Sequence, residues 1–222
     1  MANIFDKTLS RRDFMAISAS IVTAMSLGVI SGTGVGQAAE RNFPEGACAG
    51  GGQGKVLITY ASKYGSTGGV ADALGKELCG KNVGADVVLI NNASEVASYQ
   101  GVVVGSAIYR GRWMSEAADF VKRNREVLRQ VPVAYFLVCI SLARPGENNS
   151  AEVLSYLDPI LKAVPEIKPV AIGTFAGALD YHKLPVLSKT IMQSRGAPEG
   201  DFRDWNAIRA WAREPVYSKL AG

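Results

Sequence analysis

Short apolar runs alternate with amphipathic segments from residue 55 to the end of the chain. The apolar runs predict five strands, at 56–61, 86–90, 101–105, 132–139 and 168–175. The helical spacing of apolar residues predicts helices over 66–80, 115–130, 150–164 and from Asp204 onward. Strands that are apolar throughout and joined by helices form parallel sheets covered on both faces. The pattern therefore predicts a doubly wound α/β domain with a five-stranded parallel sheet, whose ligand site lies where loops leave the carboxyl ends of the strands.

Residues 1–54 do not follow this pattern. Arg11 and Arg12 in "TLSRRDFM" precede a chargeless, mildly apolar run that ends in small residues near Ala39. This arrangement resembles a twin-arginine export signal over 1–39, and an uncleaved membrane anchor is the alternative. Gly-rich residues 40–54 predict a flexible linker, which leaves 55–222 as one domain. We therefore expect export to the periplasm or to the outer face of the cytoplasmic membrane.

The composition argues against a nucleic-acid partner and a metal site. The formal net charge of +4 is too small to indicate a nucleic-acid partner. His182 is the only histidine, and no pair of the three cysteines has the spacing of metal ligands. We therefore expect no metal site, and the sequence assigns no catalytic residue.

The loop after the first strand has the chemistry of a phosphate site. It lacks the glycine pattern of a dinucleotide site, and Glu77 stands where a nucleoside-triphosphate loop needs a hydroxyl residue for magnesium. Hydroxyl groups, a glycine that lets the backbone curl, and the start of a helix can together hold a phosphate monoester. An ordinary strand-to-helix turn is the alternative. The candidate ligands are Ser62, Lys63, Tyr64, Gly65, Ser66 and Thr67.

Two further loops fit a flat ring. A flavin ring needs an aromatic face and backbone polar groups along its edge, and Tyr109 or Trp113 could stack on it. The candidate residues of the second loop are Ser106, Ala107, Ile108, Tyr109, Arg110, Gly111 and Trp113. The third loop could cover the opposite face of the ring, with candidates Ser141, Leu142, Ala143 and Arg144.

Taken in their order along the chain, the three loops resemble those of the flavodoxin family, whose first loop has the form Ser/Thr-x-Thr-Gly-x-Thr. Tyr64 departs from that form, so backbone amides are expected to hold the phosphate there. More narrowly, residues 55–214 resemble the flavodoxin-like, menaquinone-dependent protoporphyrinogen IX dehydrogenases through "ASKYGST", "GSAIYRGRW", "LVCISLARP", "FAGALDY" and "DFRDWNAIRAWARE". The resemblance implies non-covalent FMN, with its phosphate in the first loop and its ring between the second and third loops.

The resemblance does not decide between two functions, an enzyme and an electron carrier. Electron carriers of the flavodoxin family are typically acidic, whereas Arg110, Arg112 and Arg144 lie near the expected ring and favour anionic groups such as porphyrin propionates. This favours a dehydrogenase that acts on a porphyrinogen with menaquinone as acceptor. Export favours the alternative, a periplasmic FMN electron-transfer protein with an unknown redox partner, because protoporphyrinogen oxidation is expected in the cytoplasm. A flavin-free binding module on the same fold is a third possibility.

Residues 177–201 form a long connection with an apolar stripe beside basic residues. In the related dehydrogenases such an insertion is linked to quinone or membrane contact. Segment 183–195 is therefore the candidate for peripheral membrane contact, and a small helix packed on the domain is the alternative.

Overall fold

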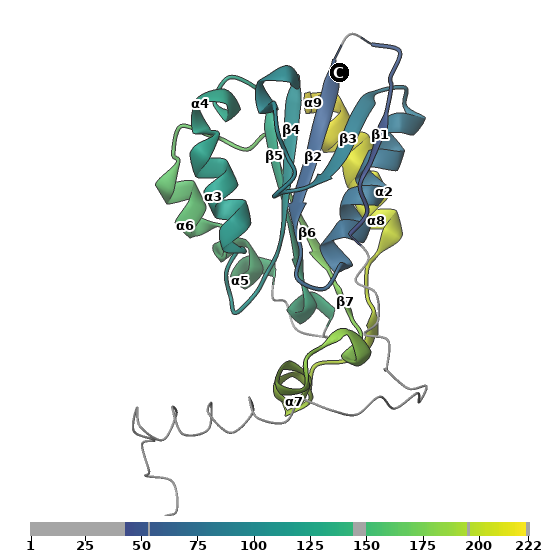
Figure 1. Cartoon of the computed structure of the whole chain (residues 1–222), viewed down its shortest axis with the longest axis vertical. Coiled ribbons are helices and arrows are strands. Elements are labelled where there is room, and N and C mark those ends of the chain that lie inside the picture. The colour runs from purple at the N-terminus through teal and green to yellow at the C-terminus, as the bar shows by residue number, and fades with distance from the viewer. Residues whose placement is uncertain (1–42, 53, 144–149, 195, 221–222) are drawn as a thin grey trace, which may run out of the picture. The chain divides into compact units, whose positions relative to one another are not determined.

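The computed structural model describes residues 43–52, 54–143, 150–194 and 196–220, which belong to one compact unit. Its centre is a six-stranded sheet in the order β1-β3-β2-β4-β5-β6 (Figure 1). The strands are β1 (Gly46–Cys48), β2 (Lys55–Ala61), β3 (Gly84–Leu89), β4 (Gly101–Ala107), β5 (Val133–Cys139) and β6 (Ala171–Ala176). The strands β2 to β6 pair in parallel, so the predicted five-stranded parallel sheet is confirmed. The strand order reverses between β2 and β4, which places a ligand crevice beside the loops that follow these two strands.

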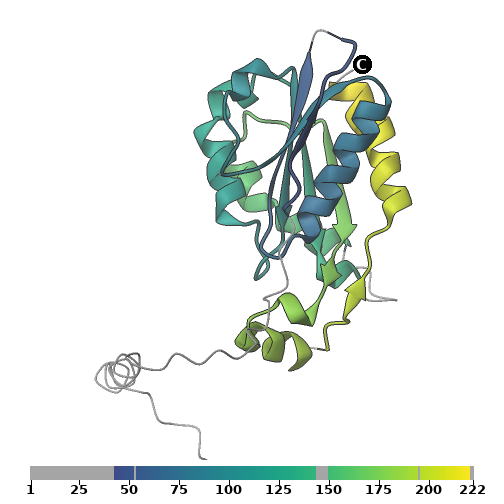
Figure 2. The same cartoon turned by 45° about the vertical axis from the view of Figure 1, so that its right-hand side comes forward.

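Helices cover both faces of the sheet (Figure 2). On one face lie α2 (Ser66–Gly80), α8 (Trp205–Trp211) and α9 (Tyr217–Leu220), packed over one apolar cluster. The other face carries α3 (Ser115–Arg123), α4 (Arg125–Leu128), α5 (Ser150–Ser155) and α6 (Asp158–Ala163), packed over a second cluster. Shorter turns are the 3₁₀ helices Val96–Ser98, Ile140–Ala143 and Tyr181–Lys183, and the π-helix Ala212–Val216.

Two of the predicted helices are divided. The segment 115–130 breaks at Asn124, whose side-chain amide donates to the Phe120 carbonyl oxygen over 2.9 Å. Such a side chain competes with the backbone for helical hydrogen bonds. The segment 150–164 breaks before Pro159, which has no amide hydrogen to continue the helical ladder and sits in the first turn of α6.

Strand β1 corrects the prediction of a flexible linker. It pairs antiparallel with β3, with Gly46 opposite Val87 and Cys48 opposite Ala85. A disulfide joins Cys48 to Cys79 in the last turn of α2, with 6.1 Å between their Cα atoms. The segment after residue 42 is therefore fastened to the domain at the outer edge of β3. The predicted export signal, 1–39, lies outside the described residues.

A β-ribbon extends the chain after β6. Its strands are β7 (Ala178–Leu179) and β8 (Gly200–Asp201), which pair antiparallel, and helix α7 (Val186–Ser194) lies between them. Figure 1 shows α7 beyond the carboxyl ends of the parallel strands. Within the described ranges, none of the helices combines the length and apolar character that a membrane crossing requires.

Candidate functional site

The turn between β2 and α2 is the candidate anion cradle. Gly65 precedes the helix with a φ of 91°, a left-handed conformation that glycine adopts without strain. Its amide donates to the Ser62 hydroxyl oxygen over 3.0 Å, which fixes the curl of the loop. Within the described part of the chain, no side chain caps the start of α2. The first amides of the helix and its positive dipole end are therefore available to an anion.

Thr67 supplies a buried hydroxyl to this cradle. Its side chain is fully buried, and its Oγ1 atom has no hydrogen-bond partner within the described structure. Leaving a buried hydroxyl unpaired is costly, so an oxygen-rich ligand would restore a missing interaction. Thr67 lines a hollow of about 90 Å³, which has room for a phosphate group but not for a whole mononucleotide.

The second loop is a tight β-hairpin. Ile108 bridges to Trp113, and Tyr109 and Arg112 exchange backbone hydrogen bonds of 2.9 and 3.3 Å. The two residues at its tip, Arg110 and Gly111, both have positive φ angles, 54° and 71°, as a type I′ turn requires. This conformation presents the side chain of Tyr109 toward the first loop.

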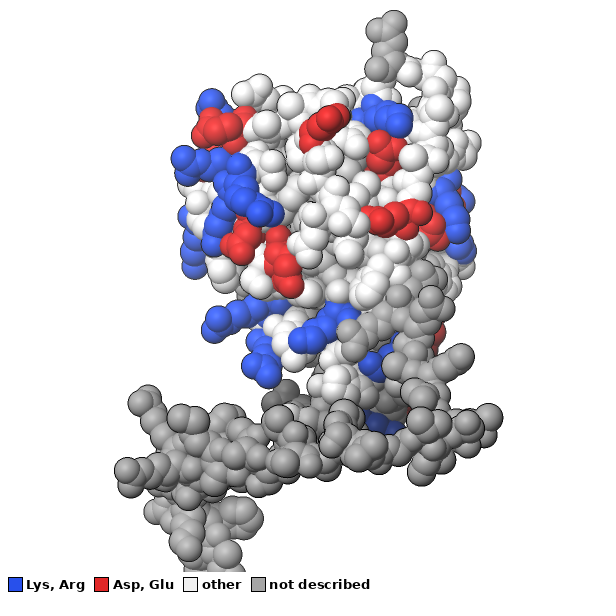
Figure 3. All heavy atoms as spheres, viewed as in Figure 1, with Lys and Arg blue, Asp and Glu red and all other residues white. Residues whose placement is uncertain are grey.

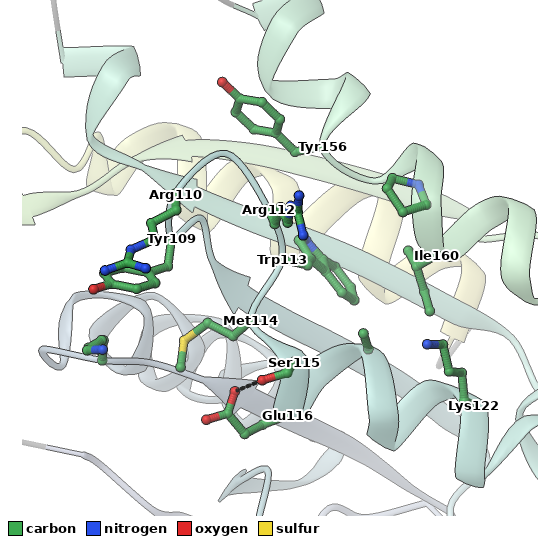
Figure 4. A pocket seen from close by; sticks show the side chains of 13 residues that line it. Tyr109, Arg110, Arg112, Trp113, Met114, Ser115, Glu116, Lys122, Tyr156 and Ile160 are labelled. Atoms are coloured by element: carbon green, nitrogen blue, oxygen red, sulfur yellow. Dashed lines mark hydrogen bonds between the residues drawn. The ribbon is translucent and has the colours of Figure 1, made fainter. Parts of the chain in front are cut away.

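Tyr109 and Trp113 have different environments. The indole of Trp113 is buried and packs edge-on against Tyr135, with ring centroids 5.2 Å apart. The Tyr109 ring is partly exposed. Lys63 Nζ lies 4.1 Å from its centroid. The Arg110 guanidinium lies 5.3 Å from the same centroid (Figure 4). Burial alone would raise the pKa of the Tyr109 phenol, but the polar contact and charge of Lys63, with Arg110 beside it, lower that pKa. Tyr109 is therefore the better placed of the two for stacking on a bound ring.

Ser106 has a structural role in the same loop. It is fully buried, and its hydroxyl oxygen accepts a 2.9 Å hydrogen bond from the Met114 amide. This bond closes the base of the hairpin and joins it to the start of α3.

The 90 Å³ hollow brings together part of the predicted site. It is lined from the first two loops by Ser62, Lys63, Tyr64, Ser66, Thr67, Ala107, Ile108 and Tyr109. From the third loop it receives Ile140, whereas Ser141, Leu142 and Ala143 lie in the following turn outside its lining. The Ser141 hydroxyl lies 2.9 Å from the Cys139 sulfur atom. Arg144 lies outside the described residues.

The ribbon contributes residues that the sequence analysis missed. Leu179, Leu184 and Met192 line the hollow and pack with Tyr64 in a small apolar cluster. The ribbon is joined to the first loop by the Ala178 amide, which donates to Ser66 Oγ over 2.8 Å.

Arg203 was also missed. Its guanidinium donates to the Ser66 carbonyl oxygen over 3.3 Å and pairs with Asp201 over 2.6 Å. It lines a second hollow of about 260 Å³ at the start of α2, together with Gly65 and Gly69. The sequence signal was present in "DFRDW", but nothing in the sequence placed that stretch beside residue 66.

Comparison with known proteins identifies relatives of this chain. A model of the flavodoxin domain matches residues 57–204. Protoporphyrinogen IX dehydrogenase [quinone] from Leishmania major is 27% identical over 179 residues, which cover 75% of this chain and 77% of that protein. The protein of the same name from Escherichia coli K12 is 29% identical over 171 residues, covering 72% and 93%. Oxidised flavodoxin 2 from Bacillus cereus aligns over 74% of this chain and 99% of its own, with 20% identity and a TM-score of 0.46.

Proposed function

The chain belongs to the flavodoxin domain family, and on that premise we propose that it binds FMN non-covalently and works as an oxidoreductase. The observation that carries the proposal is the buried, unpartnered hydroxyl of Thr67 beside the uncapped start of α2. Both features fit a phosphate monoester. When bound, FMN would supply hydride or electron transfer.

The residues of the chain have distinct tasks in this proposal. The amides that follow Gly65 and the hydroxyls of Ser62 and Thr67 hold the phosphate, and Lys63 adds positive charge. Tyr109 offers an aromatic face to the flavin ring, while Ile140 and Leu184 exclude water from the hollow.

We propose further that the reaction is oxidation of a porphyrinogen with a quinone as electron acceptor. Support comes from the two relatives of that name, which the chain matches over 77% and 93% of their lengths. The cations Lys63, Arg110 and Arg112 near the expected ring suit an acidic substrate better than they suit the basic partners of acidic carriers.

A second candidate function is an exported FMN electron carrier, and the disulfide Cys48–Cys79 favours it. Disulfides persist in oxidising compartments and are rare in the cytosol. This agrees with the twin-arginine pattern at Arg11 and Arg12. We therefore propose that the protein is periplasmic.

Helix α7 is the proposed membrane contact. Val186 and Leu187 are 82% and 73% exposed, and Ile191 is 43% exposed, on a helix that also carries Lys189. Exposed apolar side chains next to basic ones bind the interface of an anionic bilayer. Such a contact would bring a membrane quinone close to the hollow that Met192 lines.

The FMN proposal is tested by flavin content. We expect Gly65→Val to abolish FMN retention, because a β-branched side chain is strained at a φ of 91°. The control is Gly80→Val at the other end of α2, where an added Cβ atom meets no neighbour within 4 Å. Equal flavin content in the two variants would place the site elsewhere.

The reaction is tested by anaerobic mixing of the FMN-loaded protein with protoporphyrinogen and a menaquinone analogue. Loss of the oxidised flavin absorption on adding the porphyrinogen, and its return with the quinone, are expected of the dehydrogenase. Absence of flavin reduction would leave the carrier function. For location, a Lys-Lys replacement of Arg11 and Arg12 should retain the protein inside the cell.

A further inference from the structure

A larger hollow lies on the other side of the Tyr109 hairpin. It measures about 790 Å³ and is bounded by the hairpin, α3 and α6. Figure 4 shows Tyr109 and Arg110 at one end, Lys122 at the other, and Trp113 between them. This volume lies in the range of sites that enclose a molecule of drug or cofactor size.

Positive charge dominates the rim of this hollow. Lys63, Arg110, Arg112 and Lys122 line it, and among the described residues none of the four is ion-paired with an acidic side chain. Among the described residues that line it, the one carboxylate is Glu116, which accepts a 3.2 Å hydrogen bond from the Ser115 hydroxyl. Figure 3 shows Lys and Arg side chains gathered over α3 and α4 and near the carboxyl ends of the strands. Cations without acidic partners at the rim of a concave site raise the local concentration of anions and bind carboxylates directly.

The walls between these cations are apolar and aromatic. Trp113, Met114 and Ile160 lie on the inner side, and Tyr156 lines the hollow near α6. An apolar interior with charges at the rim favours a ligand with a hydrophobic body and carboxylates at its edge.

The two hollows share two residues. Lys63 and Tyr109 line both the large hollow and the 90 Å³ hollow of the phosphate loop. A ligand in the large hollow would therefore be separated from the proposed flavin site only by the Tyr109 side chain and its neighbouring cation.

We propose that the 790 Å³ hollow binds the reductant of the reaction, a macrocycle-sized molecule with an apolar body and at least two carboxylates. Arg112 and Lys122 hold the carboxylates, Trp113 and Ile160 contact the apolar body, and Tyr109 is the wall toward the flavin. This inference rests on the proposed function for the identity of the reaction, but the binding site itself does not.

Binding of protoporphyrin IX to the FMN-loaded protein, followed by calorimetry, tests the proposal. We expect Arg112→Glu and Lys122→Glu each to weaken binding roughly tenfold or more, the effect of losing a charge-assisted hydrogen bond. The matched control is Arg123→Glu, which makes a similar charge reversal on α3 at an exposed residue outside the hollow. It should bind within about twofold of the wild type, since an exposed charge beyond the site contributes little. Flavin content should be the same in all four proteins.

The dimethyl ester of the porphyrin separates carboxylate recognition from stacking. The ester should bind more weakly than the diacid to the wild type, and equally to wild type and variants. The proposal is overturned if the wild type does not bind the diacid, if ester and diacid bind alike, or if Arg112→Glu and Lys122→Glu bind like Arg123→Glu. Carboxylate-dependent binding without flavin reduction by the porphyrinogen would refute the dehydrogenase function and leave this site standing. Porphyrinogen oxidation at the wild-type rate by both Arg112→Glu and Lys122→Glu would refute this site and leave the dehydrogenase function standing.

Discussion

Loss of the Cys48–Cys79 disulfide should lower the free energy of unfolding by about 3.7 kcal/mol. This value follows from the chain-entropy relation applied to the sequence separation of 31 residues. The closed loop contains all of β2 and most of α2, so the cross-link constrains the unfolded chain across the centre of the fold. For a domain of this size the loss corresponds to a fall in melting temperature of roughly 7–15 °C.

Guanidinium unfolding with and without a reductant measures this effect. Thiol titration of the denatured protein gives the redox state, because Cys139 is the free cysteine and the chain has three cysteines in all. The double variant Cys48→Ala, Cys79→Ala should unfold at the midpoint of the reduced wild type and should not respond to reductant. If the reduced wild type shows three thiols and an unchanged midpoint, the loop-closure argument is refuted.

Three further predictions concern the site and the ribbon. Thr67→Val should weaken FMN binding by roughly 1.5–3 kcal/mol, the value of a hydrogen bond to a charged group, without destabilising the FMN-free protein. The control is Thr59→Val, because the Thr59 hydroxyl is also buried and has no partner within the described structure, but it lines none of the three hollows. An equal loss of FMN affinity in Thr59→Val would contradict the assignment of Thr67 to the phosphate site. Lys63→Gln should raise the pKa of Tyr109, because Lys63 lowers that pKa. The pKa is measured by alkaline absorbance titration of each protein, from which the titration of its Tyr109→Phe version is subtracted. A pKa that is lower in the folded protein than in the unfolded chain increases the free energy of unfolding only as pH rises through that pKa. Relative to the wild type, Lys63→Gln should therefore be less stable at alkaline pH. An unchanged Tyr109 pKa in the variant would show that Lys63 has no influence on it. Leu187→Asp on α7 should reduce sedimentation of the protein with anionic vesicles. The control, Leu154→Asp, changes an exposed leucine on α5 and should not reduce it. Equal vesicle binding by the two variants would exclude α7 as the membrane contact.

The parallel sheet and the first loop could be read from the sequence because both have strong local signals. Strands such as Val133–Cys139 are apolar throughout, and the turn at Gly65 comes shortly after β2, whose interior is mostly apolar. Strand β1 could not be found in this way. It has three residues, none of them buried, and contains a glycine, so it has no periodicity and depends on its pairing with β3.

The pairing of Cys48 with Cys79 likewise depends on β1, since only the sheet brings these residues together. The aromatic residues of the second loop show a different limit. Sequence placed Tyr109 and Trp113 together as stacking candidates, but the turn at Arg110 and Gly111 reverses the chain between them. One ring then faces the first loop and the other enters the core.

If α7 binds a membrane as proposed, the hydrogen bond from the Ala178 amide to Ser66 Oγ would link the cofactor and the membrane thermodynamically. Ser66 belongs to the cradle, while Ala178 begins the ribbon that carries α7. If both FMN and membrane binding change the free energy of this contact, FMN changes the affinity of α7 for the membrane by a definite factor. Linkage then requires docking to change the affinity for FMN by the same factor. A bilayer that tightens the ribbon would in this way retain the flavin, and a molecule that leaves the bilayer would release it more readily.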